Sequence, residues 1–97
     1  MNIEIKAVHF SLDDEQKAYI QKKLERIRTA ENILVDFHVT LTKDAHEYAA
    51  EANVHFKWGV HAHVKECDFE VLAAADKMLD GLRTKIIKEK EKAEQRR

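Results

Sequence analysis

The sequence predicts an α+β fold with the element order β-α-β-β-β-α, in which two helices pack on one face of a four-stranded sheet. Two observations lead to this prediction. Four segments alternate apolar and polar residues, as half-buried strands do, and two longer segments repeat apolar residues at intervals of three and four, as amphipathic helices do. Since each strand has one apolar face and each helix one apolar stripe, the economical packing covers one side of the sheet with both helices.

The first strand and the first helix occupy the N-terminal third of the chain. Residues 1–8 alternate, with apolar side chains at positions 3, 5 and 7. Ser11 is the expected start of a helix that runs to about Thr29, because acidic residues follow in its first turn, where the helix dipole favours them. The predicted buried face of this helix consists of Tyr19, Ile20, Leu24 and Ile27.

Three further strands are predicted over residues 33–42, 48–57 and 60–65. The connections between them, residues 43–47 and the pair Trp58-Gly59, are short, so the three strands form an antiparallel meander. The first strand is joined to the second through a helix, which allows the two to pair in parallel. The inward-facing residues of the second strand are predicted to be Val35, Phe37, Val39 and Leu41.

The last segment, residues 69–97, shows the longest helical pattern in the chain. Its apolar stripe consists of Val71, Leu72, Ala75, Met78, Leu79, Leu82 and Ile86. At roughly 100° per residue, four lysines fall on one flank of the stripe and four acids fall on the far side. The lysines are Lys77, Lys85, Lys88 and Lys92, and the acids are Asp76, Asp80, Glu91 and Glu94. We hypothesise that this basic flank meets Lys22, Lys23 and Arg26 of the first helix to form one continuous basic surface.

Length and composition favour one small domain of residues 1–97. The apolar content of 44% suits one compact core, and the apolar runs are too short for a signal peptide or a membrane span. The single cysteine, Cys67, cannot form an internal disulfide and fits a reducing compartment. We therefore expect a cytoplasmic protein that does not enter a membrane.

The charges are unevenly distributed along the chain. The formal net charge is −1, which argues against a general nucleic-acid binder. Residues 77–97, however, hold eight basic and four acidic residues, so that the remaining chain is acidic. Such asymmetry supports binding of an anion on one surface, although a solvated helix face has the same pattern.

The sequence shows only weak signals of metal binding or catalysis. Six histidines are many for this length, and His61 and His63 are expected to share the exposed face of one strand, but no cysteine pair or His-Glu helix motif accompanies them, so we expect no metal site. Cys67 lacks the glycine-rich oxyanion loop that a nucleophile needs. The sequence also contains no phosphate-binding glycine loop. We expect no enzyme activity, no catalytic residue, no cofactor and no small-molecule substrate.

Four stretches of the chain resemble the ribosome hibernation promoting factor family, which includes the related inhibitor protein Y. They are Met1-Asn2-Ile3-Glu4-Ile5, residues 19–27 (YIQKKLERI), residues 51–55 (EANVH) and residues 73–90, which begin Ala73-Ala74-Ala75-Asp76. The resemblance covers nearly the whole chain and implies a short form of the family. The family often has a lysine where this chain has Gly81.

The resemblance implies a fold similar to double-stranded RNA-binding domains. It also implies that the partner is the small ribosomal subunit and its ribosomal RNA, where family members block the messenger RNA and transfer RNA channel in bacteria in stationary phase or under stress. Whether ribosome dimers form stays open, and the free protein is expected to be a monomer. The alternative is a protein-interaction module that uses the exposed face of the sheet.

The family's RNA-contacting positions lie on both helices. Matched residue by residue, the resemblance implies five RNA-binding residues here, with four more in support. The five are Lys23, Arg26, Lys85, Lys88 and Lys92, and the supporting ones are Lys22, Arg28, Arg83 and Lys90.

Overall fold

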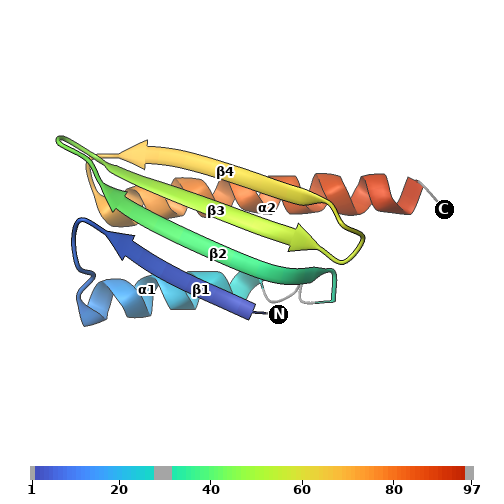
Figure 1. The fold of residues 1–97 in the computed structure, drawn as a ribbon, viewed down its shortest axis with the longest axis horizontal. Coiled ribbons are helices and arrows are strands. Elements are labelled where there is room, and N and C mark those ends of the chain that lie inside the picture. Colours follow the sequence, from blue (N-terminus) through green and yellow to red (C-terminus); the bar gives the residue numbers. More distant parts are fainter. Residues whose placement is uncertain (1, 28–31, 96–97) are drawn as a thin grey trace.

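The predicted order of elements is confirmed in the computed structural model, which describes residues 2–27 and 32–95 (Figure 1). The elements are β1 (Asn2–Val8), α1 (Asp14–Glu25), β2 (Leu34–Lys43), β3 (Tyr48–Phe56), β4 (His61–Asp68) and α2 (Val71–Gln95). The expectation for Arg28 falls outside the described residues. The predicted end of the first helix near Thr29 is too late, since α1 ends at Glu25 with Arg26 as its C-cap. None of the helices in the described part of the chain has the length and apolar character needed to cross a membrane.

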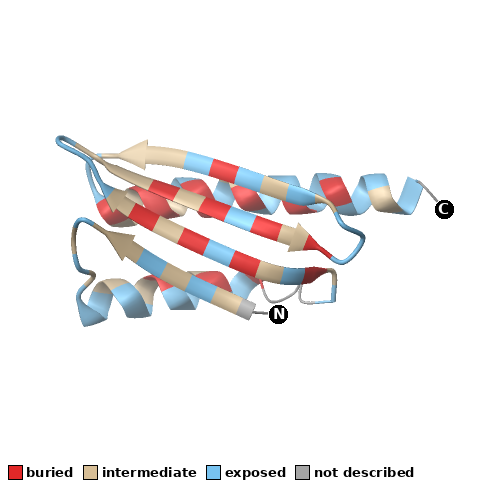
Figure 2. Ribbon diagram, in the orientation of Figure 1, coloured by how far each residue is buried: buried red, intermediate tan, exposed pale blue. Residues whose placement is uncertain are grey.

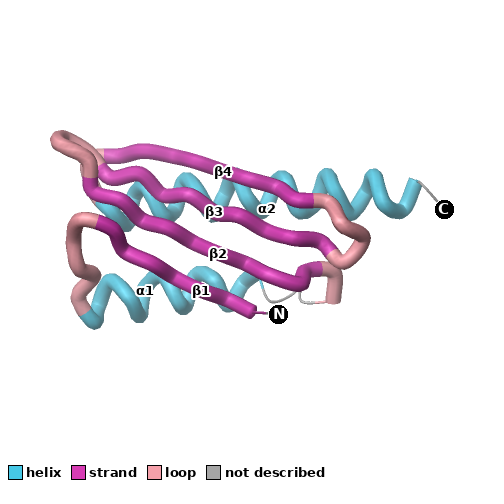
Figure 3. Tube along the Cα trace, viewed as in Figure 1, coloured by secondary structure: helices cyan, strands magenta, loops and turns pink. Residues whose placement is uncertain are grey.

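The strands form one sheet in the order β1-β2-β3-β4. β1 pairs with β2 in parallel, whereas β2 with β3 and β3 with β4 pair in antiparallel, as predicted. Figure 3 shows the short turns of the meander, and it shows both helices behind the same face of the sheet. Helix α2 packs against β3 and β4 and also contacts α1. No helix in the described part of the chain covers the opposite face of the sheet.

The core lies between the sheet and the two helices (Figure 2). Buried residues alternate with more exposed ones along β3, where Ala50, Ala52, Val54 and Phe56 are buried toward the helices. The prediction for Val35 is wrong, since this side chain is 43% exposed and Leu34 is buried instead. The register shifts between Leu34 and Asp36, which marks a β-bulge, and the extra residue reverses the alternation at the start of β2.

The N-cap of helix α1 lies two residues after Ser11, the predicted start of the helix. Asp13 is its N-cap, and the Asp13 carboxylate accepts a hydrogen bond of 2.7 Å from the Gln16 backbone N–H. The Gln16 side chain accepts in return from the Asp13 backbone N–H at 3.1 Å, which completes a capping box. This reciprocal pair satisfies two backbone donors, so Asp13 outcompetes Ser11 as the start of the helix.

The C-terminal half of α2 is held to the β3–β4 turn by Trp58. The Trp58 indole stacks on Phe56 with ring centroids 5.3 Å apart, and its Nε1 donates a 2.9 Å hydrogen bond to Glu89. Glu89 is buried, and the hydrogen bond from Trp58 satisfies its carboxylate. This explains why an acid is tolerated beside the apolar stripe of this helix. The contact fixes the rotation of α2 near Lys88 and Lys92, and both of these lysines are exposed.

The two helices are joined across their interface by Asp76 of α2. The Tyr19 hydroxyl of α1 donates to the Asp76 carboxylate oxygens at 2.9 and 3.1 Å, and Lys23 Nζ lies 3.7 Å from the same carboxylate. The Lys23 ammonium also lies 5.4 Å from the centre of the Tyr19 ring. Asp76 therefore lies on the flank of α2 that faces α1.

Replacing Asp76 with alanine is expected to lower the free energy of unfolding by about 1–2 kcal/mol, because the part-buried Tyr19 hydroxyl loses its acceptor. Asp76→Asn keeps an acceptor oxygen and should lose less. Urea unfolding of these two variants, of Tyr19→Phe and of the double variant Asp76→Ala with Tyr19→Phe gives a double-mutant cycle. The cycle measures the coupling energy between the two side chains. Additive losses from Asp76→Ala and Tyr19→Phe would show that the two side chains do not interact.

Candidate nucleic-acid interface

The basic residues of the helix layer fall into two groups on opposite flanks of α2. The groove group, Lys23, Arg26 and Arg83, lines a groove of about 640 Å³ between α1 and α2. The edge group, Lys85, Lys88 and Lys92, lies on the flank of α2 that faces β4. Arg83 and Lys85 are only two positions apart in sequence, but they point about 160° apart around the helix.

The groove has an apolar floor and a rim of mixed charge. Ile27, Leu79 and Ile86 are buried along it, and Ile87 is 49% exposed at its side. Its three cations are accompanied by two carboxylates, Asp76 and Asp80. The groove is therefore only weakly positive, and it suits an anion that also brings an apolar or planar surface.

The edge group lies beside the free edge of the sheet. Lys85 Nζ donates to the backbone carbonyl of His63 in β4, the last strand of the sheet. A carbonyl is neutral, so Lys85 keeps its positive charge while it covers this edge, a common way of blocking unwanted strand pairing. Among the described residues, no ion pair joins Lys85, Lys88 or Lys92 to a carboxylate.

The continuous basic surface hypothesised from the sequence is not formed. The flank of α1 that carries Lys23 and Arg26 faces Arg83 of α2, and the edge group lies on the other side of that helix. The physical reason is how the apolar stripe of α2 lies on β3 and β4, which leaves the flank of Asp76 and Arg83 facing α1. Lys22 is exposed on α1 but is not among the residues that line the groove.

Gly81 interrupts the row of lysines on the flank that faces β4, one turn from both Lys77 and Lys85. A Cβ atom at Gly81 would lie 3.1 Å from Cγ1 of Val64, which is closer than ordinary van der Waals contact. Glycine at this position therefore allows α2 to approach β4 closely.

Replacing Gly81 with alanine is expected to change stability little, because a gain of about 1 kcal/mol in helix propensity is offset by the close contact with Val64. In a Val64→Ala background the contact disappears, so the same substitution should stabilise by about 1 kcal/mol. Urea unfolding of the four proteins measures this coupling. An effect of Gly81→Ala that is equal in both backgrounds would rule out the contact as its cause.

The connection from β4 to α2 is held by an ion pair between Asp68 and Lys77. Lys77 Nζ lies 2.9 Å from Asp68, and the Glu70 backbone N–H donates to the same carboxylate at 3.2 Å. Lys77 and then the Glu70 N–H hold the pKa of Asp68 below its ordinary value of 3.8. In turn, the Asp68 carboxylate raises the pKa of Lys77 above 10.5.

The stabilisation from Asp68 is expected to be present above its ordinary pKa of 3.8 and to be lost as the pH falls through the lowered value. Lys77 contributes in the opposite sense, since its stabilisation is lost only as the pH rises through its raised pKa, above 10.5. Melting temperatures of the wild type and Asp68→Asn between about pH 2 and 6 measure the stabilisation that the ionised Asp68 contributes. The two curves should converge below the lowered pKa, and a constant difference would exclude this ion pair as the source.

The open face of the sheet pairs its histidines with carboxylates. His38 lies 3.0 Å from Glu4, His63 lies 3.3 Å from Glu51, and His55 lies 3.9 Å from Asp36. His61 stacks on His55 with ring centroids 4.1 Å apart. Within residues 2–27 and 32–95, no three metal-binding side chains are placed to hold an ion.

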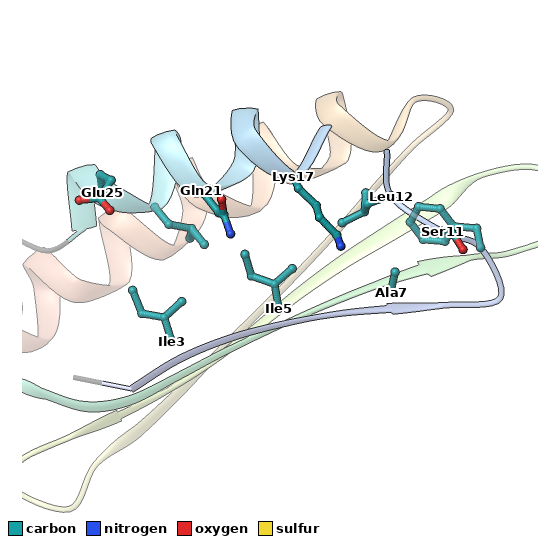
Figure 4. Close-up of a pocket in the computed structure, with 10 residues that line it drawn as sticks. Ile3, Ile5, Ala7, Ser11, Leu12, Lys17, Gln21 and Glu25 are labelled. Carbon is teal, nitrogen blue, oxygen red and sulfur yellow. The ribbon is translucent and has the colours of Figure 1, made fainter. Parts of the chain in front are cut away.

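A second groove, of about 660 Å³, lies between β1 and α1 (Figure 4). Figure 4 shows Ile3 and Ile5 pointing from the strand toward the helix, with Lys17, Gln21 and Glu25 along the other side. The polar side chains that line it are Ser11, Lys17, Gln21 and Glu25. In the described part of the chain no hydrogen bond joins Ser11 to Lys17 or Glu25, so these residues do not form an oriented pair of nucleophile and base.

Comparisons with known proteins agree with this architecture. The family model described as sigma 54 modulation protein / S30EA ribosomal protein matches residues 3–94. The structure of a ribosomal subunit interface protein from Coxiella burnetii superposes with a TM-score of 0.84 at 19% identity, over 94% of this chain and 99% of that chain. The N-terminal domain of protein Y from Thermus thermophilus superposes with a TM-score of 0.75 at 28% identity, over 89% and 96%. No curated protein sequence matches significantly.

Proposed function

Because the chain belongs to the sigma 54 modulation protein / S30EA ribosomal protein family, we propose that it binds the small ribosomal subunit and inhibits translation. The match over residues 3–94 confirms the resemblance seen in the sequence. The family consists of non-enzymatic, ribosome-associated modulation proteins. The similar structures include a ribosomal subunit interface protein, and this supports the ribosome as the partner.

The helix layer is the proposed RNA-binding surface. The observation that carries this assignment is the edge group, in which three exposed lysines at helical spacing share one flank and have no carboxylate ion pair among the described residues. Such lysines can neutralise phosphates and release the counterions that surround them. The groove group adds two arginines, whose planar guanidinium groups can hold a phosphate through two hydrogen bonds each.

The proposed inhibition requires no chemical step. Phosphate contacts position a protein on RNA without reading its sequence, so specificity for the small subunit comes from the shape of the surface that receives it. A rigid domain seated in the channel for messenger RNA and transfer RNA excludes both by occupying their space. Synthesis of the protein in stationary phase or under stress, in the bacterial cytoplasm, would then silence idle ribosomes.

Filter binding of labelled transfer RNA to small subunits programmed with messenger RNA tests the blocking step. Prior addition of the protein should reduce transfer RNA binding in proportion to the fraction of subunits that it occupies. Undiminished transfer RNA binding on fully occupied subunits would contradict occlusion of the channel, even if the protein binds ribosomes.

A variant of the open sheet face separates this proposal from a protein-interaction module. His38→Gln with His63→Gln removes the pairs with Glu4 and Glu51 and leaves both helices intact. We expect small-subunit binding and translation inhibition to be unchanged in this variant. Loss of inhibition here, together with full activity of a helix-layer variant, would favour the sheet face as the functional surface.

A further inference from the structure

Phe69 is the most exposed large apolar side chain in the described part of the protein. Its exposed fraction is 77%, compared with 49% for Ile87, 43% for Val35 and 37% for Trp58. It lies in the two-residue connection between β4 and α2, and it is absent from the core cluster and from the residues packed against it. The ring therefore contributes little to the fold.

The backbone on both sides of Phe69 is held firmly. On one side, Asp68 pairs with Lys77 at 2.9 Å and accepts from the Glu70 backbone N–H at 3.2 Å. On the other side, the Glu70 carbonyl accepts from the Ala74 N–H at 3.0 Å, which begins the hydrogen bonding of α2. Because the backbone at Phe69 is already fixed, little backbone freedom is lost when a partner covers the ring.

Further aromatic rings and cations lie at the same end of the sheet. Figure 1 shows the β2–β3 turn, the end of β4 and the start of α2 together at this end. Asp68 is paired in register with Tyr48, and Tyr48 with Lys43. Lys43 Nζ lies 5.9 Å from the centre of the Tyr48 ring, and the Phe10 ring meets Tyr48 edge-on at 5.1 Å. Lys43 and Lys77 are both exposed, but Lys77 is held by the Asp68 carboxylate, so Lys43 is the cation here without an ion pair among the described residues.

We propose that this end of the protein is a base-stacking site, in which Phe69 stacks on an unpaired nucleobase of RNA while Lys43 faces a neighbouring phosphate. Aromatic rings beside lysines are the usual means of holding single-stranded RNA, because every base has a face to stack on. A protein partner would instead call for a contiguous apolar patch, and Phe69 is flanked by the charged residues Asp68 and Glu70. The inference rests on the proposed function, since that function supplies the RNA.

The test compares Phe69→Ala, Phe69→Leu and Phe69→Tyr for affinity to purified small subunits, with Val35→Ala as a control for removing an exposed apolar side chain elsewhere. Loss of one stacked base weakens binding by roughly 5- to 100-fold, which is the effect expected for both Ala and Leu. Tyrosine keeps the aromatic face and should retain wild-type affinity. Melting temperatures should not change, because the ring is exposed.

Two results would overturn the stacking site. Wild-type affinity of Phe69→Ala would show that the ring is not used, and wild-type affinity of Phe69→Leu with weak binding of Phe69→Ala would identify an apolar pocket on a protein. The salt dependence of binding should stay the same in Phe69→Ala, since stacking releases no counterions. Failure of the wild-type protein itself to bind small subunits would instead refute the proposed function.

Discussion

Replacing Lys85, Lys88 and Lys92 with glutamate is expected to weaken binding to purified small subunits by about 100-fold or more near 0.1 M salt. Each lysine that neutralises a phosphate contributes about 0.7–0.9 to the slope of log affinity against log salt, so the slope should fall by about 2–3. All three side chains are exposed, and only Lys85 makes a contact with β4. The melting temperature of the triple variant should therefore stay close to that of the wild type.

A matched triple variant controls for net charge. Lys6, Lys57 and Lys65 are also exposed, but they lie on the open sheet face and in the β3–β4 turn. Replacing these three with glutamate changes the net charge by the same amount and should weaken binding far less. Equal losses in the two triple variants would show that overall charge, rather than the edge group, governs binding to the subunit.

Reversing the charge of the two arginines of the groove group is expected to have the second large effect on binding to the small subunit. Arg26→Glu with Arg83→Glu would leave Lys23 as the one cation among the charged residues that line the groove, beside Asp76 and Asp80. We expect binding to fall by about tenfold or more, because two guanidinium contacts to phosphate are replaced by repulsion. Equilibrium binding, with melting curves to verify the fold, measures this change.

Lysine at the same two positions is the control for geometry. Arg26→Lys with Arg83→Lys keeps the charge but removes the planar fork, so an intermediate affinity is expected if the groove holds phosphates in two-bond contacts. Because the groove and edge groups lie on opposite flanks of α2, their effects on binding free energy should add when the variants are combined. A combined variant that binds no worse than the edge variant would exclude the groove from the interface.

Most of the fold followed from the sequence because its signals are local. Alternation located all four strands, and their short connections predicted the meander. The bulge at Val35 could not be predicted from a period of two, since it depends on pairing with β3. The start of α1 was misplaced although Asp13 and Gln16 carried the spacing of a capping box, which is a local signal that was available.

The candidate site was only partly predictable. The sequence placed Lys85, Lys88 and Lys92 on one flank of the last helix, and the structure agrees that they share it. Which flank of α2 faces α1 depends on how the helix lies on β3 and β4, which a helical pattern does not specify, so the sequence did not bring Arg83 together with Lys23 and Arg26. Phe69 was included in the helix, and its exposure at the end of β4 became visible only in three dimensions.

The central claim is that the helix layer binds small-subunit RNA through its lysines and arginines. Co-sedimentation of the wild type and the Lys85→Glu, Lys88→Glu, Lys92→Glu variant with purified small subunits, over a series of salt concentrations, tests it most directly. The wild type should sediment with the subunits at low salt and be released steeply as salt rises, whereas the variant should be released at much lower salt and with a shallower dependence on salt. Binding that is insensitive to salt, or equal in the two proteins, would contradict the claim.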